Sequence, residues 1–282
     1  MKILQFPSKY FNIKDTLECG QIFRFRPFKK GYFVISGGHA CYVFEENSTT
    51  FLHVENGDEE GYFLNFFDIK RDYESIVLTL EKSQEEIIKT SVNLGKGIRI
   101  LKQDLAETLF SFIISQNNNI PRIKSTIEKL CFSFGEEKEF MGEKYFAFPN
   151  YNAISNLNIS TLKSFGLGYR AEYVLNLAIL LKNGLDLNQL KTLSDCDLKA
   201  ELLKIKGVGP KVADCVMLFA FSRTGSFPVD TWLKKVYIEN FNGNETNTVK
   251  ISKYFTDRFS QNSGFLQQYL FNYKRNLEKS LK

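Results

Sequence analysis

Cysteine pairs and histidines are scarce in this chain, and their scarcity excludes several kinds of site. The five cysteines stand far apart and form no Cys-X-X-Cys pair. This spacing excludes the usual zinc and iron–sulfur ligand patterns and argues against a disulfide framework. Only two histidines occur, His39 and His53, and neither lies in a recognisable motif. The sequence therefore predicts no catalytic metal, no cofactor and no histidine-based nucleophile.

Long apolar runs and a secretory leader are also missing. No apolar stretch is long enough to cross a bilayer, and the N-terminal MKILQFPSKYF does not have the profile of a signal peptide. We therefore expect no membrane association and a cytoplasmic protein, associated with the nucleoid if the source is bacterial. No internal repeat or low-complexity linker divides the 282 residues, which suffice for one large or two modest domains.

Positive charge is concentrated towards the C-terminal end of the chain. Residues 201–282 contain 13 Lys+Arg against 7 Asp+Glu, whereas the first 200 residues contain 24 against 25. A basic half beside a neutral half suits a polyanion that docks on one face. Chance fluctuation explains the charge alone equally well.

The first part of the chain has the pattern of an antiparallel sheet. Residues 21–28 alternate phenylalanine with arginine, and residues 31–44 form two β-rich runs around Gly37 and Gly38, which indicates a hairpin. Residues 51–56 favour a further strand.

From Tyr73 onward the spacing of apolar residues becomes helical. Pro121 suits the first turn of a helix, and Ser194 and Asp197 have roughly the spacing of a capping box. The predicted helical segments are 72–90, 104–116, 120–135, 161–184, 194–206 and 264–282. We therefore predict an α+β protein, with an N-terminal antiparallel sheet domain and flanking helix at 1–95 packed on a mostly helical domain at 96–282.

The segment KIKGVGPKVADCV predicts two helices joined by a tight glycine turn. Gly207 and Gly209 allow unusual backbone angles and leave N–H groups uncovered, and Pro210 suits the first helical position. The exposed amides and the positive end of the second helix form an anion site suited to a DNA phosphate. Carbonyl oxygens around the turn could also hold a monovalent cation, and the candidates are Leu203, Ile205 and Val208.

Lys211 and Asp230 are the candidate chemical groups beside this turn. Lys211 lies in the first turn of the second helix, where the helix dipole and partial burial favour a neutral, nucleophilic amine, with Cys215 one turn further on the same face. Asp230 follows a proline-marked loop and suits the N-cap of the next helix. A carboxylate held there could stabilise positive charge on a ribose that loses its base. The alternative for Lys211 is a solvated surface lysine that touches phosphate.

These residues resemble the helix-hairpin-helix DNA glycosylases, and more narrowly the 8-oxoguanine DNA glycosylases. The match includes GVGPKVADC with PVD, LECGQIFRF, SFIISQNNNIPRI, FGLGYRAEYV and GFLQQYLF, in the same order over almost the whole chain. The resemblance implies that Lys211 attacks C1′ of a damaged nucleoside, expels the base and forms a Schiff base, with Asp230 as the assisting carboxylate. Strand cleavage by β-elimination follows. The partner is duplex DNA that contains 8-oxoguanine, and we expect a monomer.

The resemblance also implies a pocket for a base that is flipped out of the duplex. The carbonyl of Gly20 would accept the N7 hydrogen that 8-oxoguanine has and guanine lacks. Cys215 and Phe271 would sandwich the base, and Gln267 would bond its Watson–Crick edge. Without the motif, Phe271 would be interpreted as core packing.

By the same resemblance, four residues act on the opposite strand. Asn117 would fill the hole left by the flipped base, Tyr169 would wedge into the stack, and Arg122 and Arg170 would bind the orphaned cytosine. Alternatively, either arginine is only a helix-surface charge. One residue departs from the pattern: eukaryotic members usually have a histidine where this chain has Trp232.

Two other functions remain open from the sequence. A monofunctional glycosylase for alkylated bases shares the hairpin and the aspartate but normally lacks the lysine. A noncatalytic DNA-binding module needs only the hairpin and the basic half, because phosphate contacts require no chemistry.

Overall fold

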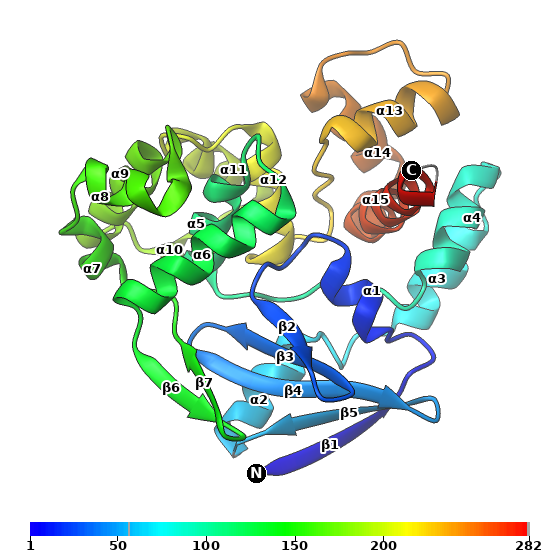
Figure 1. The fold of residues 1–282 in the computed structure, drawn as a ribbon. Helices are drawn as coiled ribbons and strands as arrows, with labels where there is room; N and C mark the ends of the chain where they lie inside the picture. The colour runs from blue at the N-terminus through cyan, green and yellow to red at the C-terminus, as the bar shows by residue number, and fades with distance from the viewer. Residues whose placement is uncertain (56, 281–282) are drawn as a thin grey trace.

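The computed structural model describes residues 1–55 and 57–280, which form a sheet domain below a body of helices (Figure 1). The sheet is antiparallel, with the strand order β1-β5-β4-β3-β2. Its strands are β1 (Lys2–Pro7), β2 (Phe25–Phe28), β3 (Gly31–Ser36), β4 (His39–Glu46) and β5 (Thr49–Val54). The predicted hairpin between β3 and β4 is confirmed, since Gly37 and Gly38 both have positive φ angles, of 56° and 79°.

Three elements of the sheet domain escaped the sequence analysis. They are β1, α1 (Ile13–Glu18) and α2 (Gly57–Phe66). Strand β1 lies at the sheet edge and pairs with β5, which is some fifty residues away, with Lys2 opposite Val54. Local periodicity carries no information about such a distant partner. The strand predicted at 21–28 begins only at Phe25. The side chain of Gln21, at the start of the predicted segment, hydrogen-bonds to backbone groups outside the sheet.

The helical body contains the predicted helical segments, with interruptions, and the last two residues of the predicted segment 264–282 lie outside the described residues. Residues 72–90 form two helices rather than one, and the segment 161–184 is broken where Gly166 and Gly168 have φ angles of 90° and 56°. A short β6–β7 hairpin was not predicted. The elements are α3 (Tyr73–Glu81), α4 (Glu86–Gly95), α5 (Leu105–Ser115), α6 (Ile120–Phe134), β6 (Glu137–Phe140), β7 (Glu143–Phe146), α7 (Tyr151–Ser155), α8 (Ile159–Leu162), the π-helix η1 (Lys163–Leu167), α9 (Arg170–Lys182), α10 (Leu187–Leu190), α11 (Asp195–Lys204), α12 (Pro210–Phe219), α13 (Thr231–Asn240), α14 (Thr248–Phe259), the 3₁₀-helix η2 (Ser260–Asn262) and α15 (Ser263–Ser280).

A cluster of polar side chains around the buried Arg24 joins the sheet domain to the helical body. Arg24 is 1% exposed and its Nε lies 3.0 Å from a carboxylate oxygen of Glu128 on α6. Glu107 on α5 accepts a hydrogen bond from the backbone N–H of Gly37 (2.9 Å). Burial raises the pKa of Glu107 to about 7, against the attraction of Arg24. The two parts of the chain therefore share buried charge as well as apolar contact.

Helices α3 and α4 lie beside α15 (Figure 1), and their buried side chains belong to the same core as those of α12 and α15. A second core, centred on Phe63, Phe66 and Phe67, lies between the sheet, α1 and α2. Through this packing the C-terminal helix α15 shares one core with α3, α4 and α12, which come from distant parts of the chain. The domain boundary between residues 95 and 96 stays a prediction.

Candidate active site

The glycine turn between α11 and α12 has the predicted hairpin geometry. Gly207 has a φ of 90°, and a Cβ atom there would lie 2.5 Å from the ring of Tyr173, so no other residue fits without a shift. The carbonyl of Gly207 accepts a hydrogen bond from Nε2 of Gln116 (2.7 Å). Gly209 caps α12, and a Cβ atom there would meet nothing within 4 Å. The space in front of the α12 N-terminus is therefore open to a ligand.

The carbonyl oxygens proposed for a monovalent cation lie where α11 ends, a region in which helix carbonyls lack intrahelical partners. The oxygen of Ile205 accepts the N–H of Val208 at 2.9 Å and keeps one lone pair. These carbonyl oxygens suit a cation that prefers neutral oxygen ligands. Within residues 1–55 and 57–280, no group of three His, Cys, Asp or Glu side chains could hold a metal ion.

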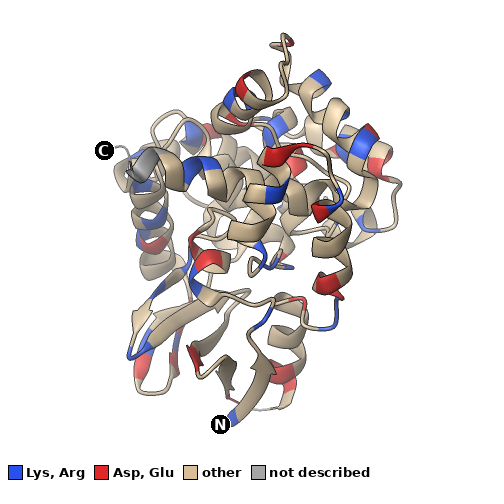
Figure 2. Cartoon of the chain, turned by 90° about the vertical axis from the view of Figure 1, so that its right-hand side faces the viewer, with Lys and Arg blue, Asp and Glu red and all other residues tan. Residues whose placement is uncertain are grey.

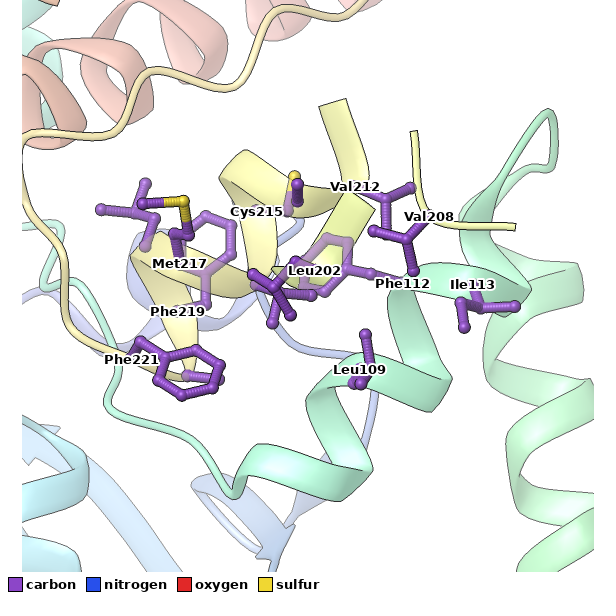
Figure 3. Packing of buried hydrophobic residues seen from close by; sticks show 14 of the residues in the cluster. Leu109, Phe112, Ile113, Leu202, Val208, Val212, Cys215, Met217, Phe219 and Phe221 are labelled. Carbon is purple, nitrogen blue, oxygen red and sulfur yellow. The ribbon is translucent and has the colours of Figure 1, made fainter. Parts of the chain in front are cut away.

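Packing against α5 fixes the helix that carries Lys211. Figure 3 shows Leu109, Phe112 and Ile113 of α5 close to Leu202 of α11 and to Val212 and Phe219 of α12, where all six are buried. The ring of Phe112 stacks on Phe219, with ring centres 5.5 Å apart. Because these contacts are apolar and closely packed, α12 has little freedom to rotate.

Lys211 itself lies at the edge of this packing and is half-buried. Its Nζ is 5.3 Å from the centre of the Phe112 ring, within the range of a cation–π contact. Cys215 follows one turn later, and burial raises the pKa of its thiol to about 11, while the nearby Lys211 charge lowers it. The thiol is therefore neutral at physiological pH and offers the site an apolar, polarisable surface.

Asp230 is the N-cap of α13, as the sequence predicts. One oxygen of its carboxylate accepts the N–H groups of Trp232 (3.0 Å) and Leu233 (2.9 Å). Burial raises the pKa of Asp230, whereas the hydrogen bond from Leu233 and the charge of Lys211 lower it. One carboxylate oxygen is thus held by the cap and the other remains for Lys211 or a ligand.

The candidate catalytic and lesion-binding residues meet at one small cavity. Its lining includes all six of them, from four separate parts of the chain: Gly20, Lys211, Cys215, Asp230, Gln267 and Phe271. Cys19, Phe112, Phe219, Pro228 and Gln268 complete the lining. The cavity measures about 60 Å³, enough for a few water molecules and not for a purine. Its walls must move apart before a base can enter.

The loop after α1 brings Gly20 to this cavity. Gly20 has a φ of 88°, and a Cβ atom would lie 3.3 Å from Cε1 of Phe271. The neighbouring Gln21 is fully buried and bonds to the carbonyls of Thr16 and Arg99 and to the N–H of Leu101. On the other side, Arg275 of α15 donates to the carbonyl of Glu18. Neither anchor was predictable from the sequence, because the partners are remote along the chain.

The four residues predicted to act on the opposite strand gather around the turn after α5. Asn117 is exposed at a φ of 45°, a conformation that asparagine tolerates. Tyr169 is 49% exposed and points its hydroxyl at the Gln116 carbonyl (3.4 Å). Arg122 is exposed and donates to the carbonyl of Gly166 (3.2 Å).

Arg170 has a different environment from Arg122. It is 4% exposed, so it is not a helix-surface charge. Its guanidinium donates to the carbonyls of Gln116 and Asn117, the latter at 2.7 Å, and weakly to that of Leu167. Since a guanidinium has five N–H groups, most are already used here. In this structure Arg170 holds the turn that presents Asn117.

Trp232 is the residue that departs from the family pattern. Its indole is half-buried against the helical core, and Nζ of Lys235 lies 5.5 Å from the ring. Its backbone N–H is one of the two that hold Asp230. The residue therefore contributes to the carboxylate's cap whatever its side chain contacts.

Charge alone does not mark a binding face. In the view of Figure 2, basic and acidic residues are interspersed over both parts of the molecule. No helix among the described residues is long and apolar enough to cross a membrane. The hairpin geometry therefore supports binding of a polyanion more strongly than net charge does.

Comparisons with known proteins identify the family to which this chain belongs. A family model for the N-terminal domain of 8-oxoguanine DNA glycosylase matches residues 3–109, and one for HhH-GPD superfamily base excision DNA repair proteins matches residues 110–261. The 8-oxoguanine glycosylase/lyase of Clostridium acetobutylicum, in complex with double-stranded DNA containing cytosine opposite 8-oxoguanine, is 34% identical over 99% of both chains, with a TM-score of 0.92. The chain belongs to the 8-oxoguanine DNA glycosylase family.

Two further relatives support the same assignment. The structure of MBOgg1 in complex with a low affinity DNA ligand is 36% identical, with a TM-score of 0.92, over 98% of this chain and 96% of that one. The probable N-glycosylase/DNA lyase of Methanothermobacter thermautotrophicus is 28% identical over 229 residues, which are 74% of this chain and 72% of the relative. The predicted α+β class and the family resemblance are therefore confirmed.

Proposed function

We propose that this chain excises 8-oxoguanine from duplex DNA, preferably opposite cytosine, and then cleaves the strand as an AP lyase. The observation that carries this proposal is the convergence of Lys211, Asp230 and the four lesion-binding candidates on one cavity, in a member of the 8-oxoguanine DNA glycosylase family. A DNA-binding module would have no need to gather an amine, a carboxylate and a glutamine around one cavity. We propose further that the enzyme acts as a monomer in the cytoplasm, associated with the nucleoid if the source is bacterial.

In the proposed reaction the Lys211 ammonium first loses a proton to solvent, and the neutral amine then attacks C1′ of the flipped nucleotide. The new N–C1′ bond forms as the C1′–N9 bond breaks, and the electron pair leaves with the base, which takes up a proton. The carboxylate of Asp230 stabilises the positive charge that develops on the sugar. The lysine nitrogen then loses a proton, the C1′–O4′ bond breaks as O4′ takes up a proton, and the opened sugar is left as a Schiff base on Lys211. Removal of a C2′ proton allows β-elimination of the 3′ phosphate.

Lesion recognition in this proposal uses the rest of the cavity. The Gly20 carbonyl accepts the N7 hydrogen, Cys215 and Phe271 flank the base, and Gln267 bonds its Watson–Crick edge. The left-handed backbone at Gly20 and its contact with Phe271 support a close approach of backbone to the base. An unmatched buried acceptor costs about 1–3 kcal/mol, which favours 8-oxoguanine over guanine.

Contacts to the DNA backbone and to the opposite strand complete the proposal. The open space beyond Gly209 and the α12 N-terminus suit a phosphate. Carbonyls of Leu203, Ile205 and Val208 would hold a monovalent cation, which supplies positive charge beside that phosphate. Asn117 fills the vacated stack, Tyr169 wedges beside it, and Arg122 contacts the orphaned cytosine. Arg170 joins Arg122 when the turn it holds rearranges.

The decisive experiment compares Lys211→Gln with Lys204→Gln on 8-oxoguanine-bearing and undamaged duplexes. Lys204 is the last residue of α11 and forms an ion pair with Glu201 at 2.6 Å, outside the cavity. Lys204→Gln therefore removes the same charge without changing a residue of the proposed reaction. We expect Lys211→Gln to abolish excision and borohydride trapping while DNA binding survives, and Lys204→Gln to retain both. An active, trappable Lys211→Gln variant would refute the role. An untrappable wild type would favour a water-based monofunctional mechanism.

A further inference from the structure

Gln268 is a buried polar residue of the cavity that the proposed reaction leaves without a role. It is 3% exposed and follows Gln267, which is 5% exposed, on α15, and both line the cavity with Lys211. Nε2 of Gln268 donates a hydrogen bond of 2.7 Å to Oε1 of Gln267. Oε1 of Gln268 is buried and has no hydrogen-bond partner among the described residues. A native structure rarely buries such a group without a use for it.

The hydrogen-bonding capacity of the two amides determines their orientation. If both amides were turned over, Gln267 would donate to Gln268, and the NH₂ group of Gln268 would become the unpartnered buried group. An unpartnered buried N–H group is rarer in proteins than an unpartnered oxygen. The arrangement in which Gln268 donates is therefore favoured. Gln267 then keeps one Oε1 lone pair and two Nε2 hydrogens for a ligand.

The orientation of a primary amide decides which purine edge it can pair with. A guanine-type edge offers an acceptor at O6 and a donor at N1, whereas an adenine-type edge offers a donor at N6 and an acceptor at N1. A glutamine that is free to turn over by 180° pairs with either edge. A glutamine held in one orientation pairs well with only one of them, because the other places like groups opposite each other.

We propose that Gln268 is a positioning residue that holds the Gln267 amide in the orientation for a guanine-type edge. This inference rests on the proposed function, since it takes Gln267 as the group that meets the base. Gln268 acts through Gln267 and needs no contact with DNA. The oxidised ring atoms at N7 and C8 identify damage, and the paired glutamines identify which damaged purine has entered.

The test compares single-turnover excision of 8-oxoguanine and of 8-oxoadenine, each placed opposite cytosine. Both bases have the N7 hydrogen and the O8 atom, so their difference in the pocket is the edge that Gln267 meets. We expect the wild type to prefer 8-oxoguanine. Gln268→Met keeps the length of the side chain and removes its donor. It should lower the ratio of the two rates about tenfold, the effect of losing one hydrogen bond to a buried group.

A double-mutant cycle with Gln267→Met separates positioning from general support. If Gln268 acts through Gln267, adding Gln268→Met to Gln267→Met changes the substrate ratio no further. Equal loss of both rates in Gln268→Met, with an unchanged ratio, overturns the inference. So does a wild type that excises both bases equally, a result that does not depend on how any variant folds. A wild type inactive on both duplexes refutes the proposed function as well, whereas an active enzyme with an unchanged ratio refutes only this inference.

Discussion

Replacement of Gly20 by alanine tests whether the cavity depends on the close contact between this loop and Phe271. A non-glycine residue at a φ of 88° costs about 1–2 kcal/mol. Alanine also lowers the conformational entropy of the unfolded chain, which offsets about 0.4–1 kcal/mol of this cost. The added Cβ also meets Phe271 Cε1 at 3.3 Å, so the ring must shift by a few tenths of an ångström. We therefore expect a loss of about 1–2 kcal/mol of unfolding free energy.

The same shift moves one face of the proposed base pocket. Since a misplacement of about 1 Å can cost roughly a hundredfold in rate, a shift of a few tenths should lower single-turnover excision of 8-oxoguanine about tenfold. Gly142→Ala is the matched control, because Gly142 has a φ of 78°, lies in the β6–β7 turn and would have no atom within 4 Å of its Cβ. Urea unfolding and excision would be measured for both variants. If Gly20→Ala loses no more stability than Gly142→Ala and excises at the wild-type rate, the reasoning is wrong.

Two further predictions concern pH. Burial raises the pKa of Asp230 above its ordinary 3.8, and the proposed role needs its ionised form. The decline of kcat/KM towards acid pH should therefore be centred above that value. Asp230→Asn should remove this decline and lower the rate at neutral pH about a hundredfold or more. An unchanged decline in Asp230→Asn would contradict the role of Asp230. Glu107 has its pKa raised by burial to about 7, from 4.5, so the folded state holds a proton that the unfolded state loses between these values. The contribution of Glu107 to the free energy of unfolding therefore falls as pH rises through that window. Measured by urea titration, the difference in this free energy between Glu107→Gln and the wild type should move by about 2 kcal/mol in favour of the variant from pH 5 to pH 8. A pH-independent difference would show that Glu107 stays ionised in the fold.

Local patterns in the sequence predicted the elements that carry the chemistry. The hairpin at Gly207, the helix start at Pro210 and the N-cap at Asp230 each depend on residues within a few positions of one another, and the structure has all three. The β3–β4 hairpin was predictable for the same reason. The family motifs then assigned each of these positions a role in DNA recognition or catalysis, which composition and periodicity could not supply.

What the sequence by itself determined is therefore the set of local conformations and the residue types available for catalysis. The tertiary structure brings Gly20, Lys211, Asp230 and Gln267 to the one cavity that the family resemblance only implied, because their distances depend on how α1, α12, α13 and α15 pack. It also decided that Arg170 is buried against carbonyls and that Gln268 holds its neighbour. Burial and hydrogen-bond partners come from segments far apart in the chain, and no local pattern encodes them.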